Sequence, residues 1–512
     1  MVSLTERTQQ SWLPLFVLAV GMSMIIIDAT IVNVAVPAII ADLRLTATDV
    51  EWVNSIYSLM FAALLIPLGR TGDVRGRRLV FVTGIVVFLA ASVLAAAAVS
   101  GPMLIAARVV QGVGASMVVP MTLAMINALY TGPRRVIAFA VWGSVIGGMA
   151  AVGPLLGGWL VTDHGWRWAF WVNIPIGLLV LAGALRVPES RDPAAGGHDL
   201  PGVLLSVVGT GSLVFGLIEG QRYGWAAPIG AERFLGLPFS PVPFAFLLAA
   251  ASLTGLVLVE RRRARAGRPV MLDLSLFAIP SFRYGGAAAT VVALGEFGMI
   301  LILPLFLQTA IGFSAFTTGL IIASLAAGSF LAGGLVPQLA RRVAARRIVQ
   351  IGLSLEAVGA AAIGLSVSPD LGPWTFVPWL MLYGLGVGFA SAQLTSVMLA
   401  GVPPRQSGQA SGLQSTMRQV GAAIGVAALG GVLVAGLGSA MESRLPSQPQ
   451  LAAAVRESGG AAIAAIRDPA TRAVAVAASA DATKRVTLVT ALVLLSGVGA
   501  ALLLPDTGVS RE

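Results

Sequence analysis

Long apolar runs alternate with short polar or glycine- and proline-rich breaks along almost the whole chain. About 20 apolar residues in a helix span the hydrocarbon of a bilayer, and the runs are close to that length. They are too long and too continuous for the alternating strands of a membrane barrel. The pattern predicts an all-helical membrane protein with about fourteen membrane-spanning helices. We expect them near residues 13–36, 51–69, 79–100, 103–128, 136–161, 168–187, 201–219, 242–259, 284–308, 315–339, 347–367, 375–400, 410–437 and 486–504.

One carboxylate interrupts the first run. Asp28 lies within residues 15–37, which are otherwise almost entirely apolar. A charged side chain in that position costs roughly 2.5–3.5 kcal/mol on insertion scales, so it needs a partner, a water-filled cavity or a function. Two interpretations stay open at this point. Asp28 is either a satisfied polar residue at a helix contact or a proton or cation site in a transporter.

A weak internal repeat relates the two halves of the chain. A shift that superposes the pair Arg77-Arg78 on Arg346-Arg347 also brings Asp28 close to Glu296, inside another apolar run. Two-fold repeats with a site at their interface are a transporter architecture. The repeat therefore predicts that Asp28 and Glu296 occupy related positions in two similar bundles.

This repeat gives the expected division of the chain. Residues 1–187 form an N-terminal six-helix bundle, and residues 281–512 form a C-terminal six-helix bundle. Residues 188–280 link them and carry two additional membrane helices. The alanine-rich stretch 438–485 is expected to be a loop outside the cytoplasm.

Arginines mark one side of the membrane. They gather in alternate short loops, whereas the loops near 309–314 and 368–374 carry no basic residue. Basic residues favour the cytoplasmic side, so we expect a multi-pass protein of the cell membrane with both termini in the cytoplasm. The arginine-rich loops contain residues 70–78, 134–135, 261–268 and 341–347.

Composition excludes several function classes. The chain is 57% hydrophobic and 11% charged, so its net charge of +10 reflects membrane orientation and not nucleic-acid binding. It contains no cysteine, two distant histidines and one lysine. Disulfides, a metal site, a Walker-type ATP site and a hydrolase nucleophile motif are therefore not expected. We expect no cofactor, and transport, scaffolding or sensing remain.

Arg108 is a second charge inside an expected helix. An isolated arginine is costly there, so we expect it to meet a carboxylate, a carbonyl group or water. Our hypothesis places it near Asp28, where it would set the proton affinity of that residue. The alternative is a permanent structural ion pair. Glu296 is expected to share proton coupling or to bind a cationic group of the substrate, and the role of Glu356 is left open.

The clearest local motif is Gly-Arg-Thr-Gly-Asp-Val-Arg-Gly-Arg-Arg at residues 69–78. Its glycines permit a tight turn, and its acid can face a helix N-terminus while the arginines pair with it. The string resembles the loop signature of the major facilitator superfamily, with mild departures at Arg70-Thr71 and Val74. The conformational motif then comprises Gly69, Asp73, Arg75, Gly76, Arg77 and Arg78.

Further segments resemble the 14-helix drug:proton antiporters of that superfamily. Residues 104–114 resemble the helix-4 motif with its buried arginine, and residues 143–158 resemble the helix-5 motif of antiporters. Similar signatures occur at 28–37, 165–177 and 401–421. In the helix-5 motif, Pro154 removes a backbone hydrogen bond and allows a bend, and small residues four apart permit close helix contact. Its residues are Gly148, Gly153, Pro154, Gly157 and Gly158.

The resemblance implies a major facilitator fold and proton-driven efflux of small amphipathic compounds by alternating access. The expected partners are a small-molecule substrate, protons and lipid, without ATP. Two alternatives stay open: export of one defined metabolite, such as an amino acid, lipid or siderophore, and a non-transporting membrane sensor or scaffold. Polar or aromatic positions that could face a central cavity are Asn33, Asn54, Gln111, Asn127, Trp142 and Phe297.

Overall fold

The computed structural model describes residues 11–505 apart from 46, 193–198, 229–233, 235–237 and 459, and this part of the chain contains helices but no strand. The expected all-helical fold is confirmed. The α-helices are α2 Leu13–Leu43, α3 Ala47–Arg75, α4 Arg77–Ala96, α5 Gly101–Leu129, α6 Gly132–His164, α7 Trp168–Trp171, α8 Asn173–Ala184, α9 Leu200–Tyr223, α10 Val242–Arg265, α11 Pro280–Leu305, α12 Ala315–Leu339, α13 Ala345–Ser366, α14 Val377–Ala400, α15 Ser407–Arg444, α16 Pro449–Glu457 and α17 Pro469–Ala501.

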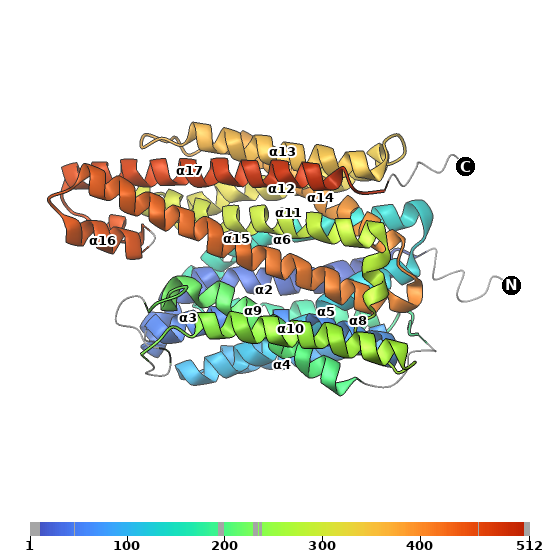
Figure 1. Cartoon of the computed structure of the whole chain (residues 1–512). Helices are drawn as coiled ribbons and strands as arrows, with labels where there is room; N and C mark the ends of the chain where they lie inside the picture. Colours follow the sequence, from blue (N-terminus) through green and yellow to red (C-terminus); the bar gives the residue numbers. More distant parts are fainter. Residues whose placement is uncertain are drawn as a thin grey trace.

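The long helices run along a common direction (Figure 1). We call the end where α2 begins and α17 ends the terminal end; α16 lies at the opposite end. Among the described residues, twelve helices are long and apolar enough to cross a membrane, and the bent helix α6 raises the number to thirteen. The segment Trp168–Ala184 is a shorter apolar stretch. The span expected at 168–187 is therefore helical, but it is shorter than a full membrane crossing.

Much of the stretch 438–485, expected to be a loop, is helical. Helix α15 continues to Arg444, α17 begins at Pro469, and α16 lies between them. Alanine has the highest helix propensity, which favours this extension beyond the apolar runs. The Asp468 side chain accepts a hydrogen bond from the Thr471 backbone N–H (2.8 Å) and caps the start of α17.

The contact between the two bundles is formed by α3, α5 and α6 on one side and by α12, α14 and α15 on the other. Helix α6 packs against α12 and α14, and α3 packs against α15. The additional pair α9 and α10 lies beside this contact, because α9 packs on both α3 and α15. The Gln221 side chain of α9 donates to the Ala427 carbonyl of α15 (2.8 Å). Helix α9 of the inserted pair therefore contacts one helix from each bundle.

Helix α6 bends in the middle, as the proline in its sequence predicts. Its two parts, Gly132–Ala150 and Val152–His164, meet at 40°. Pro154 has no N–H to donate to the carbonyl of the preceding turn, so the helix loses a hydrogen bond there. Before the bend, Gly147 lies against Ser329 of α12, and after it Gly157 lies against Ile31 of α2.

Two adjacent glycines of α6 provide a matched test of this packing. A Cβ atom at Gly157 would lie 2.9 Å from Ile31 Cγ1, whereas a Cβ at Gly158 would meet nothing within 4 Å. We expect Gly157→Val to destabilise the protein by about 1–3 kcal/mol through overpacking. Gly158→Val carries the same cost in helix propensity without the clash. Thermal unfolding of both variants in detergent measures the difference, and equal melting temperatures would contradict this packing.

Candidate functional site

Asp28 lies at the centre of a buried polar cluster in the N-terminal bundle. It is on α2, and its side chain is fully buried. One oxygen, Oδ2, accepts a hydrogen bond from Arg108 of α5 (2.7 Å). The other, Oδ1, accepts from the Asn173 amide of α8 (2.7 Å) and from Gln111 of α5 (3.1 Å). The expected proximity of Arg108 and Asp28 is confirmed.

Neighbouring groups hold this cluster in place. The Ser92 hydroxyl of α4 accepts from Gln111 (2.9 Å) and from Asn173 (3.2 Å). Arg108 Nε donates to the Val53 carbonyl (3.3 Å), and its guanidinium lies 4.1 Å from the centre of the Tyr57 ring. Five helices thus meet around a single ion pair, so a change in its charge would affect hydrogen bonds that join all five.

Sequence reasoning missed the supporting residues of this cluster. Asn173 lies inside a segment that resembles an antiporter signature, but nothing in one sequence indicates that it reaches Asp28. Ser92 and Tyr57 carry no local signal, because single hydroxyl groups are common in membrane helices. Only the topology brings α4, α8 and α3 to this point.

The arrangement pairs opposite charges inside the bundle. Asp28 and Arg108 together are neutral, and each has further hydrogen-bond partners. Each group compensates the charge of the other in the protein interior, where either charge alone would be costly.

The C-terminal bundle contains a second buried acid–arginine pair. Glu296 of α11 accepts a hydrogen bond from Arg418 of α15 (3.0 Å), and Glu296 is 1% exposed. Arg418 also donates to the Ser391 hydroxyl of α14 (3.4 Å). The sequence indicated Glu296 but missed Arg418. The signal was present, because Arg418 is an arginine inside the expected helix 410–437.

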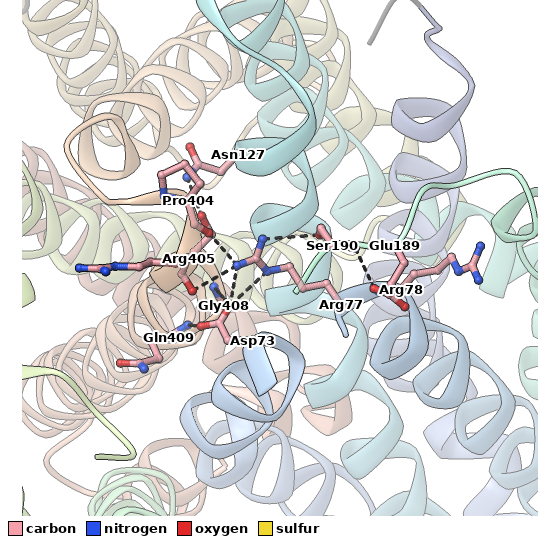
Figure 2. Close-up of polar contacts among 11 residues, drawn as sticks. Asp73, Arg77, Arg78, Asn127, Glu189, Ser190, Pro404, Arg405, Gly408 and Gln409 are labelled. Carbon is pink, nitrogen blue, oxygen red and sulfur yellow. Dashed lines mark hydrogen bonds and ion pairs between the residues drawn. The ribbon is translucent and has the colours of Figure 1, made fainter. Parts of the chain in front are cut away.

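The motif at residues 69–78 joins the bundles at the terminal end (Figure 2). The Asp73 carboxylate accepts from Arg77 (2.7 Å) and from the backbone N–H groups of Gly408 and Gln409, both at 2.8 Å. Arg77 also donates to the Pro404 carbonyl (2.7 Å). Gly408 and Gln409 are in the first turn of α15, whose N–H groups lack helical partners and favour a negative charge. We call these five residues the polar latch.

The latch is supported by a nearby amide. Asn127 of α5 donates to the Ser407 hydroxyl at the start of α15 (2.9 Å). Among the described residues, the hydrogen bonds that directly join residues 1–187 to residues 281–512 all lie at this terminal end. The bundles are therefore held together at one end of the molecule by polar contacts.

The remaining motif residues shape the turn before α4. Gly76 has φ +117°, a conformation that a side chain would strain. A Cβ at Gly69 would meet the Gly408 carbonyl oxygen, so α3 and α15 approach closely there. Arg78 donates to the Val187 carbonyl (3.1 Å), and Arg75 is exposed.

Comparison with known sequences decides the family. The sequence model of the Major Facilitator Superfamily matches residues 18–426. The chain belongs to the Major Facilitator Superfamily. It is thus a multi-pass membrane transporter and not an enzyme.

Relatives within this superfamily are similar over most of their length. The chain is 34% identical over 441 residues to a probable actinorhodin transporter of Streptomyces coelicolor, covering 84% of this chain and 73% of that one. It is 33% identical over 483 residues to the multidrug efflux pump LfrA of Mycolicibacterium smegmatis, covering 94% and 92%. The fold is similar to that of the human organic anion transporter MFSD10, with a TM-score of 0.59 at 16% identity over 96% and 99% of the chains.

The cavity residues expected for this member of the superfamily do not gather at one place. Gln111 belongs to the Asp28 cluster, and Asn127 lies beside the latch. Trp142 is buried and donates to the Thr122 hydroxyl (3.1 Å). Asn33 is exposed and Phe297 is 37% exposed. The side chain of Asn54 lies outside the described residues.

Proposed function

We propose that the chain is a proton-coupled exporter of small amphipathic compounds. The observation that carries the proposal is the buried Asp28–Arg108 pair, with the Glu296–Arg418 pair in the second bundle. Buried ionisable groups in membrane transporters mark ion pathways and proton relays. The named relatives support a drug substrate, since they include a multidrug efflux pump and a puromycin resistance protein.

The distribution of arginines supports a cytoplasmic location for the terminal end of the molecule. The basic loops follow α3, α5, α10 and α12, all of which end at the terminal end. By the positive-inside rule this end faces the cytoplasm. The polar latch then closes the cytoplasmic entrance between the bundles.

The transport cycle follows from the charge balance. A proton from outside binds an acid of the central pairs and weakens its hold on the arginine partner. The bundles then rock, the latch opens, and the proton leaves to the cytoplasm while substrate enters the cavity. Each charge that crosses the membrane supplies about 2.3 kcal/mol per 100 mV, which is sufficient to drive a concentration ratio well above one.

The range of substrates is a second question, because the relatives differ in the range of compounds for which they are named. LfrA is a multidrug pump, whereas a cephamycin export protein of Amycolatopsis lactamdurans, 33% identical to this chain over 439 residues, is named for one antibiotic class. Export of one defined metabolite is therefore the alternative function. Growth-inhibition tests with a panel of unrelated compounds in a host without its own pumps separate the two.

Vesicle transport tests the proton coupling. We expect purified protein in proteoliposomes to accumulate a fluorescent amphipathic cation when the interior is acid. A gradient of about one pH unit stores about 1.4 kcal/mol per proton, so each exchanged proton supports about a tenfold concentration ratio. A protonophore should abolish the accumulation, and protein-free vesicles serve as the control. Accumulation that is unchanged after the gradient collapses would exclude this function.

A further inference from the structure

Glu356 is a buried carboxyl that neither ion pair uses. It lies in the middle of α13, and its exposed fraction is 0%. Among the described residues, neither of its carboxyl oxygens has a hydrogen-bond partner. The hydroxyl of Tyr383, on the neighbouring helix α14, is likewise buried without a partner in the described part of the chain.

Close packing fixes the position of this carboxyl. A Cβ at Gly386 of α14 would lie 2.6 Å from the Glu356 backbone nitrogen and 2.8 Å from its Cγ. One turn later, a Cβ at Gly359 of α13 would lie 2.9 Å from Tyr383 Cβ. Helices α13 and α14 thus meet along a glycine-lined contact, and the Glu356 side chain starts from inside it.

Three ionisable groups lie near enough to Glu356 to interact with it electrostatically: Tyr383 of α14, Glu296 of α11 and Arg418 of α15. In the described part of the chain, the last two are the charged groups that act on its carboxyl. Arg418 is already bound to Glu296 (3.0 Å) and to Ser391 (3.4 Å). An ionised Glu356 would therefore be an unpaired charge beside another carboxylate, in an interior where such a charge is strongly disfavoured.

The two bundles differ in the number of buried acids for each buried arginine. The N-terminal cluster has one acid, Asp28, and one arginine, Arg108, which are neutral together without a bound proton. The C-terminal cluster has two acids, Glu296 and Glu356, but a single arginine, Arg418. This second cluster is neutral only when one of its acids carries a proton. Because Arg418 is bound to Glu296, Glu356 is the acid of this cluster that is left without a cation partner among the described residues.

We propose that Glu356 is a proton-carrying site of the C-terminal bundle, loaded in the latch-closed conformation. This inference rests on the proposed proton-coupled export and assigns a residue and a state to one proton of that cycle. When the latch opens and water reaches the cluster, the O–H bond of the acid breaks and the proton passes to water. The electron pair stays on the carboxylate, and Arg418 is then shared by two charged acids.

Infrared spectroscopy of purified protein tests the loaded state without transport. At neutral pH, the difference spectrum between wild type and Glu356→Gln should contain the carbonyl stretch of one protonated carboxylic acid. The exposed Glu189 is the matched control, so Glu189→Gln should leave that signal unchanged. Arg418→Gln leaves two acids without a cation, so we expect about twice the signal. The Arg418 variant keeps the test valid should Glu356→Gln fold poorly.

A second measurement connects this proton to transport. In proteoliposomes, Glu356→Gln should lower the number of protons exchanged per substrate by about one, as measured from the pH gradient that just stops net flux. A Glu356→Gln spectrum with the full wild-type signal would overturn the proposal, and so would an unchanged proton count. If substrate transport by the wild-type protein did not depend on the pH gradient, the proposed export function would be wrong, while the spectroscopic result on Glu356 would still hold.

Discussion

Asp28→Asn is expected to reduce proton-coupled transport to the level of protein-free vesicles. Asparagine keeps the size of the side chain and can still accept from Asn173, but it binds no proton in the accessible pH range. It also removes the charge that compensates Arg108, which is 1% exposed. Leaving one partner of a buried ion pair alone costs about 3–5 kcal/mol. Transport in proteoliposomes and thermal unfolding in detergent measure the two effects.

A double variant separates coupling from stability. Asp28→Asn combined with Arg108→Gln removes both charges, so most of the lost stability should return. Transport should stay absent, because no group at this position can then carry a proton. A double variant that regains both stability and proton-coupled transport would make the Asp28–Arg108 pair a structural ion pair and remove it from the mechanism.

Asp73→Asn is expected to open the polar latch. The Asp73 carboxylate accepts charge-assisted hydrogen bonds across the bundles, and bonds to charged groups are worth about 1.5–3 kcal/mol each. We expect a shift toward the open latch by about ten- to a hundredfold, equivalent to about 1.4–2.8 kcal/mol. Export should fall with it, since the protein then rests with its cytoplasmic entrance open.

Distances between spin labels can measure this shift directly. The chain contains no cysteine, so cysteines introduced at Thr131 and Arg341, exposed positions at the terminal end of opposite bundles, are the sole attachment sites. The Asp73 variant should populate a longer distance than wild type. Asp42→Asn is the control, because Asp42 pairs with Arg167 (2.7 Å) within one bundle. Identical distance distributions for wild type and Asp73→Asn would show that the latch does not hold the closed state.

The fold was largely predictable because the bilayer imposes one length on every apolar run. The runs located the helices, and Pro154 located the bend of α6. Their ends were less predictable. Helices α15 and α17 continue past their apolar parts, because alanine supports a helix outside lipid as well as inside it.

The site was predictable where a charge stands inside an apolar run, and at residues 69–78, where a recognisable motif occurs. Asp28 and Arg108 were found by their cost in lipid, and their contact follows from that cost. Asn173 has no such cost and gave no signal. The latch partners in α15 were also invisible, because Asp73 contacts their backbone N–H groups and every residue except proline has one.

This last feature affects how the sequence can drift. The latch recognises the main chain of Pro404, Gly408 and Gln409, so most side chains in that segment can be exchanged without loss of these three contacts, although replacing Ser407 would remove the supporting bond from Asn127. Gly408 is one exception, since a Cβ there would meet Asp73, and proline at position 409 is another, since it lacks an N–H. Substitutions are therefore expected to be tolerated more readily at Arg405 than at Asp73 and Arg77, which act through their side chains.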